Sequence, residues 1–136
     1  MPPRAEVVLL CDQVIQDALS GKKSLIGLFT VVFSQNFPTV HPRMFIYASI
    51  LAAPRQKVIA AWRLVGPRGF LQDLSVGEVT VGLEGRAELI ADLVGIPFPE
   101  PGDYKFIVML NDQEAGETSV TLTRIGTETG APGSVH

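Results

Sequence analysis

The most informative segment of the chain reads Ile96-Pro97-Phe98-Pro99-Glu100-Pro101-Gly102-Asp103-Tyr104. Its three prolines stand at alternating positions and favour an extended, stiff backbone, because proline fixes φ and also restricts the residue before it. Pro101 and Gly102 then predict a sharp turn, and Tyr104 opens the next apolar segment. In immunoglobulin-like sandwiches, a tyrosine in such a place ties its hydroxyl back to the corner. We therefore predict a structural corner formed by Pro101, Gly102 and Tyr104. The alternative is a proline-rich ligand for a recognition domain.

The apolar segments on either side of this corner are short, rich in Val, Ile, Leu and Phe, and bounded by turn residues, which is typical of closely spaced strands. We expect strands at residues 6–15, 24–33, 44–51, 57–65, 104–110 and 118–125, and a less regular one within 70–83. Asn111 to Gly116 predicts a hairpin with a somewhat extended connection. The segment from Ala87 to Val94 suits a strand or a short helix, and strand is favoured because its neighbours are strands. Together these elements predict an all-β, immunoglobulin-like antiparallel β-sandwich of about 7–9 strands.

The alternation of apolar residues also predicts which faces are buried. Val7, Leu9, Cys11 and Ile15 are expected to share one face of the first strand, and Val58, Ala60, Trp62 and Leu64 one face of the strand at 57–65. The segment 24–33 is apolar on both faces, which predicts a strand covered on two sides or one at a subunit contact.

The composition excludes several classes of protein. The chain has 136 residues, of which 46% are apolar and only 18% charged, against about 25% charged in an average soluble domain. Its net charge is −3, and the sequence has no Lys/Arg run, so a nucleic-acid partner is not expected. The high apolar fraction disfavours disorder. We expect one domain at residues 1–125 and a flexible tail at 126–136.

The single cysteine, Cys11, excludes an intramolecular disulfide. The N-terminus lacks the features of a signal peptide, and the apolar runs are too short to span a bilayer. These observations predict a cytoplasmic protein without a membrane partner.

Several short motifs together carry a resemblance. They are Leu9-Leu10-Cys11-Asp12, Ser20-Gly21-Lys22 leading into Ser24-Leu25-Ile26-Gly27-Leu28-Phe29, Phe37-Pro38, His41-Pro42 and the corner at Pro101-Gly102-Asp103-Tyr104. Over about residues 5–125, the chain resembles an uncharacterised bacterial family of small, single-domain proteins of unknown function. The resemblance implies a β-sandwich-like fold, and it supplies no catalytic residues.

The sequence offers no constellation for catalysis or metal binding. Cys11, His41 and His136 lack the close spacing of a zinc site, so we expect no metal and no cofactor. Cys11 is expected to be a small buried apolar residue. The chain has neither a Gly-x-Ser-x-Gly elbow nor a phosphate-binding loop, so we expect no enzyme. An unrecognised activity would need Asp12 and His41 to meet in a pocket.

The segment 36–42 is the expected interaction loop, and its members are Phe37, Pro38, Val40, His41 and Pro42. The two prolines stiffen it, so presenting Phe37 and Val40 to a partner costs little ordering entropy. The alternative is that Phe37 plugs one end of the sandwich.

The low charge leaves few means of guarding sheet edges. We therefore predict a non-enzymatic protein that acts through protein–protein contacts, either by self-association or as an accessory subunit of a larger assembly. The alternative is a small-ligand module with an apolar pocket at one end of the sandwich, near Phe37, His41 and Trp62.

Overall fold

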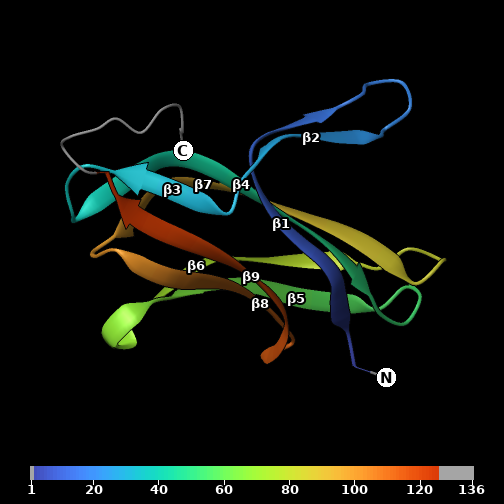
Figure 1. Ribbon diagram of the computed structural model, residues 1–136. Coiled ribbons are helices and arrows are strands. Elements are labelled where there is room, and N and C mark those ends of the chain that lie inside the picture. The colour runs from blue at the N-terminus through green and yellow to red at the C-terminus, as the bar shows by residue number, and fades with distance from the viewer. Residues whose placement is uncertain (1, 126–136) are drawn as a thin grey trace.

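The computed structural model describes residues 2–125 and shows two β-sheets packed face to face (Figure 1). Its elements are β1 (Arg4–Gln16), β2 (Lys23–Leu28), β3 (Val31–Ser34), β4 (Thr39–Leu51), β5 (Lys57–Val65), the 3₁₀ turn η1 (Pro67–Gly69), β6 (Leu71–Thr80), β7 (Arg86–Phe98), β8 (Gly102–Leu110) and β9 (Gln113–Arg124). One sheet has the order β2-β1-β4-β7 and the other β3-β9-β8-β5-β6. Neighbouring strands pair antiparallel, except that β3 runs parallel to β9. The predicted immunoglobulin-like β-sandwich is confirmed.

The core lies between the two sheets. Val58, Ala60, Trp62 and Leu64 of β5 are all buried, as their alternation predicts. The strand prediction for residues 87–94 is also confirmed, since β7 contains them. The predicted tail at 126–136 lies outside the described residues. No helix within residues 2–125 is long and apolar enough to cross a membrane.

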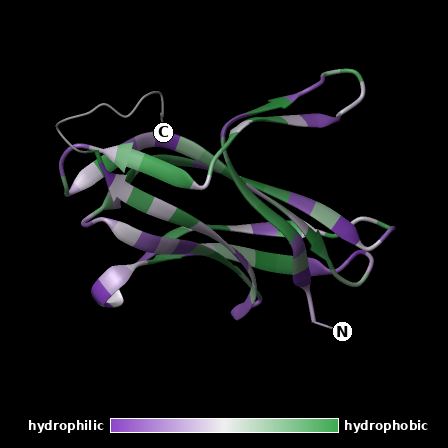
Figure 2. Cartoon of the chain, viewed as in Figure 1, coloured by the Kyte–Doolittle hydropathy of each residue, from purple (hydrophilic) through white to green (hydrophobic). Residues whose placement is uncertain are grey.

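The prediction of one strand at 24–33 was wrong, because the chain changes sheets there. β2 ends at Leu28 in the first sheet, and β3 begins at Val31 in the second, where it pairs with residues 121–124 of β9. β3 is almost uniformly hydrophobic (Figure 2), although only Val32 of its members is buried. The two apolar faces of 24–33 thus belong to two short strands with different neighbours.

The predicted inner face of β1 was also wrong. Leu10 is buried in the core and Val8 packs against it, whereas Val7 is 39% exposed. Cys11 is nevertheless buried, beside Leu10. Five consecutive apolar residues stand at 7–11, so alternation could not decide between the two faces.

Beyond Cys11, β1 leaves β4 and pairs only with β2 among the described strands. The resulting hairpin arm, residues 12–28, projects from the sandwich at the upper right of Figure 1. Its exposed apolar residues include Leu19 at 98% and Leu28 at 59% exposure.

The connection between β8 and β9 is tighter than predicted. Leu110 pairs directly with Gln113, so the turn consists of Asn111 and Asp112, with φ of 52° and 67°. Positive φ at both central residues is what a two-residue hairpin turn requires, and Asn and Asp tolerate it. The extra length that suggested a longer loop is taken up by a bulge between Val108 and Met109.

The expected loop at 36–42 is only partly a loop. β4 begins at Thr39, so Val40, His41 and Pro42 are strand residues. Pro42 is tolerated because β1 pairs with β4 only from Phe45 onward, and the ladder to β7 skips Pro42.

Candidate functional site

The corner at Tyr104 is a structural feature. The Tyr104 hydroxyl donates to the Glu100 carbonyl at 2.6 Å and accepts from the Glu100 N–H at 3.2 Å. Its fully buried ring meets Phe98 edge-on, with centroids 4.9 Å apart. Burial raises the pKa of Tyr104. Gly102, with φ of 140° and packed against Pro67, completes the turn after Pro101.

The expected interaction residues are divided between the core and the surface. Phe37 packs against the core, in agreement with the alternative that it plugs one end of the sandwich. The Arg124 guanidinium lies over its ring, with Cζ 5.2 Å from the ring centroid. Pro38 follows a cis peptide bond and is exposed. His41 is half-buried, with its ring centroid 5.9 Å from that of Phe29. Val40 is 59% exposed. Pro38, Val40 and Pro42 are therefore the apolar side chains of this segment that are open to a partner.

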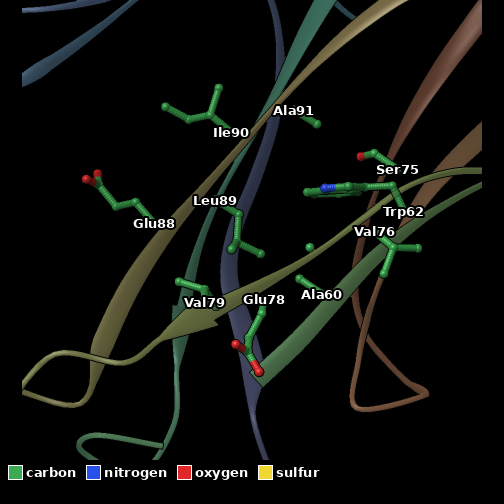
Figure 3. Close-up of a pocket in the computed structure, with 11 residues that line it drawn as sticks. Ala60, Trp62, Ser75, Val76, Glu78, Val79, Glu88, Leu89, Ile90 and Ala91 are labelled. Carbon is green, nitrogen blue, oxygen red and sulfur yellow. The ribbon is translucent and has the colours of Figure 1, made fainter. Parts of the chain in front are cut away.

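A cleft of about 320 Å³ opens on another side of the molecule, where the edges of the two sheets meet (Figure 3). It is lined by residues 75–79 of β6, 88–91 of β7, and Ala60 and Trp62 of β5. It forms because β6 and β7 are consecutive in the chain, belong to different sheets and are each the last strand of their sheet. Neither Phe37 nor His41 lines it, so the structure does not unite them with Trp62 around this cavity.

Trp62 is the most buried of the cleft-lining residues that carry a polar side-chain group. Its side chain reaches from β5 toward β7, and Figure 3 shows the ring nitrogen on the side of Leu89 and Ile90. The residue is 4% exposed, and the indole N–H has no hydrogen-bond partner within residues 2–125. Buried tryptophan N–H groups normally find an acceptor.

Two carboxylates, Glu78 and Glu88, are the charged groups of the lining. Glu88 is held in place, because Lys23 Nζ donates to its Oε1 at 2.6 Å and the Tyr47 hydroxyl to its Oε2 at 2.5 Å. These hydrogen bonds lower the pKa of Glu88, that from Lys23 most. Burial, together with the bond to Glu88, raises the pKa of Tyr47 to about 12. Glu88 is thus a fixed negative charge at neutral pH.

This pair predicts an alkaline transition. Tyr47 should ionise at about pH 12 in a titration followed by its ring resonances in NMR spectra. Its pKa is raised in the folded state, so its contribution to stability is complete below the unfolded value of about 10 and is lost as the pH rises through the folded value. In Glu88→Gln, the pKa of Tyr47 should fall below about 12 but stay above about 10, because burial, the largest cause of the shift, remains. Glu114→Gln, on β9, is the control and should leave it unchanged. An unaltered Tyr47 pKa in Glu88→Gln would contradict the assignment.

The backbone beside the cleft is open to pairing. β7 has 13 residues and pairs only with β4 among the described strands. Its central part, residues 87–94, contains no proline and no lysine, which are common guards of edge strands. Its two acidic side chains, Glu88 and Asp92, are in ion pairs with Lys23 and Arg43. By contrast, the edge strand β3 has only four residues.

The described residues contain neither a metal-binding cluster nor an activated thiol. Within 2–125, no group of three or more His, Cys, Asp or Glu side chains is placed to hold a metal ion. Burial raises the pKa of the Cys11 thiol, so the thiolate is disfavoured.

Comparison with known families identifies the group of proteins. The family described as "Family of unknown function (DUF6941)" matches residues 6–123. The chain belongs to this family. The resemblance to a family of unknown function is therefore confirmed, and the DUF6941 match covers nearly all of the sandwich. No curated protein matches this chain.

Solved structures show where the same architecture occurs. The alkylpurine DNA glycosylase AlkC of Pseudomonas fluorescens, bound to DNA containing an abasic site analog, is 9% identical, with a TM-score of 0.59 over 88% of this chain and 30% of the glycosylase. A β-glucosidase from Listeria innocua in complex with isofagomine is 9% identical, with a TM-score of 0.51 over 88% of this chain and 16% of the glucosidase. An immunoglobulin-like protein from Pseudomonas aeruginosa is 15% identical over 90% of this chain and 97% of its own, with a TM-score of 0.42. This DUF6941 chain thus spans less than a third of the two enzymes, and the likeness to them shows the fold alone.

The residues around the cleft were missed by sequence reasoning. Ser75, Glu78 and Glu88 look like ordinary strand residues, and residues 81–85 between β6 and β7 fit a hairpin as well as a crossing between sheets. Gly82 and Gly85 signal a turn without showing which sheet the chain enters next.

Proposed function

We propose that this chain is a non-enzymatic β-sandwich module that acts through protein–protein contacts, and that an extended segment of a partner adds to the free edge of β7. The observation that supports the proposal most is the unguarded central part of β7 beside the open cleft. In an antiparallel pair, part of the edge strand's N–H and C=O groups point away from its neighbour. An added strand would pair with these groups, as in other cases of β-strand addition. The single, buried Cys11 suits a reducing compartment, so we also propose the cytoplasm.

The side chains around this edge suit a partner strand. Ile90 and Val94 of β7 are 41% and 69% exposed, and Val76 of β6 is 69% exposed. Covering apolar area of this kind stabilises association by about 25 cal/mol per Å². The charge deficit of the whole chain fits this assignment, because an edge that pairs with a partner cannot carry the usual charged guards.

The experiment is a selection of phage-displayed octapeptides on the immobilised protein, followed by affinity measurement with the resynthesised peptides. Ile90→Lys places a lysine guard on β7, and Ile26→Lys is the matched control on β2, where the isoleucine is similarly exposed and lies outside the cleft lining. We expect Ile90→Lys to weaken binding at least about tenfold and Ile26→Lys to leave it within about twofold. Bound peptide should slow hydrogen exchange along β7.

Two results would overturn the proposal. One is equal affinity of the Ile90→Lys and Ile26→Lys variants. The other is protection from hydrogen exchange confined to strands other than β7 and β6. Light scattering on the free protein gives the oligomeric state, and a stable dimer whose interface protects β7 would replace the partner by a second copy.

A further inference from the structure

Resting on the proposed edge addition, we propose that the partner segment is basic: one of its oxygens accepts the Trp62 indole N–H, and a lysine or arginine beside it lies against Glu78. This assigns the cleft between β6 and β7 as the specificity pocket of the β7 edge. The pocket would then select among extended segments that main-chain pairing alone cannot distinguish.

The indole N–H of Trp62 is the group in the cleft that lacks a hydrogen-bond acceptor. Trp62 lines the cleft and is only 4% exposed. Its indole N–H has no hydrogen-bond acceptor in the part of the chain that the structure describes. A donor left unpaired in a buried place is costly, and that cost is relieved when a ligand oxygen enters. A peptide supplies such an oxygen at every residue, so a strand laid along β7 can place a carbonyl there.

The space around the indole is small and mostly apolar. Ala60, Gly77 and Ala91 leave room that larger side chains would fill, and Leu89 and Val79 border it. This favours a short apolar side chain of the partner next to the carbonyl that faces Trp62.

The negative charge around the cleft indicates that the partner segment carries positive charge. Glu78 and Glu88 line the cleft, and its lining includes no lysine or arginine. Lys23 reaches Glu88 from the hairpin arm, whereas no ion pair of Glu78 is present within residues 2–125. Glu78 is therefore the carboxylate to which an incoming cation would bind.

The same charges argue against a second copy as the occupant. A copy paired edge to edge would bring its own Glu78 and Glu88 to this edge, and like charges facing each other destabilise strand pairing. The net charge of −3 adds a general repulsion between copies. A basic segment of another protein meets neither obstacle.

The experiment uses the octapeptides enriched on the wild-type protein and, for each, a version with glutamate in place of its basic residue. Trp62 is the sole tryptophan of the sequence, so its indole ¹⁵N–¹H resonance and its fluorescence report on this pocket directly. We expect the enriched peptides to share a lysine or arginine, to shift the indole resonance, and to lose affinity when that residue is exchanged for glutamate.

Three variants locate the contacts. Trp62→Phe keeps most of the ring and removes the N–H, and should weaken binding about tenfold. Glu78→Gln should weaken it about fivefold and reduce its salt dependence. Glu114→Gln removes an exposed carboxylate on β9 and should leave the affinity within about twofold.

The outcomes separate this inference from the proposed function. If peptides bind and Ile90→Lys abolishes binding, but the indole resonance does not move or the enriched sequences are not basic, the edge addition stands and the specificity pocket is overturned. If Ile90→Lys has no effect on peptides that do shift the indole, the edge addition falls. The indole resonance of the wild-type protein tests the specificity pocket even if the Trp62→Phe variant does not fold.

Discussion

Gly66→Ala is expected to lower the free energy of unfolding by about 3 kcal/mol, the upper part of the range for an overpacked core. A methyl group at this position would lie 2.4 Å from Cε2 and 2.5 Å from Cδ2 of Tyr104. The ring cannot move aside, because its hydroxyl is bonded to both main-chain groups of Glu100 and the ring makes T-shaped contacts with Phe98 and Phe70. Gly66 itself has φ of −150°, an extended conformation that any residue adopts, so the effect comes from contact alone.

Urea denaturation of Gly66→Ala measures this effect, with Gly77→Ala as the matched control. Gly77 is also a glycine with ordinary φ, and no atom lies within 4 Å of a Cβ added there. Its replacement should be neutral or slightly stabilising, because alanine restricts the unfolded chain. Equal stability of the two variants would show that the contact between Gly66 and Tyr104 does not constrain the fold.

Tyr104→Phe is expected to cost about 1–3 kcal/mol, since it leaves the partly buried carbonyl and N–H of Glu100 without their partner. The ring and its packing against Phe98 are retained, so the loss reports the hydroxyl specifically. The midpoint of urea denaturation should fall without a change in its slope.

The control for Tyr104→Phe is Tyr47→Phe. The Tyr47 hydroxyl bonds to a carboxylate that keeps a second partner in Lys23 and remains accessible to water, so its removal should cost less. Amide exchange at Glu100 should accelerate in Tyr104→Phe and stay unchanged in Tyr47→Phe. A smaller loss for Tyr104→Phe than for Tyr47→Phe would contradict the assignment of the corner.

Strand positions could be predicted wherever alternation was unambiguous. β5 matches the predicted 57–65 because turn residues bound it and Lys57 and Arg63 mark its outer face. The corner was predictable because Pro101, Gly102 and Tyr104 each act on the local backbone. The crossing after Leu28 could not be predicted, since hydropathy records burial and not the sheet in which a strand lies.

The cleft could not be predicted for the same reason. Trp62 was recognised as a core residue, but its proximity to Glu78 and Glu88 depends on β6 and β7 ending two different sheets on one side. Phe37, expected to line a pocket with Trp62, packs against the core beneath Arg124 and does not line this cleft. Long-range pairing decides such neighbourhoods, and a local pattern does not contain it.

The parallel pairing of β3 with the C-terminal part of β9 governs how the chain can fold during synthesis. Residues 31–34 receive their partner only when residues 121–124 have emerged from the ribosome, and β9 also supplies an inner face opposite β1. The first sheet can assemble once β7 is made, but its apolar inner face stays uncovered until the last strands arrive. The nascent chain therefore exposes apolar surface to which chaperones can bind. This surface is covered when β9 pairs with β8 and β3.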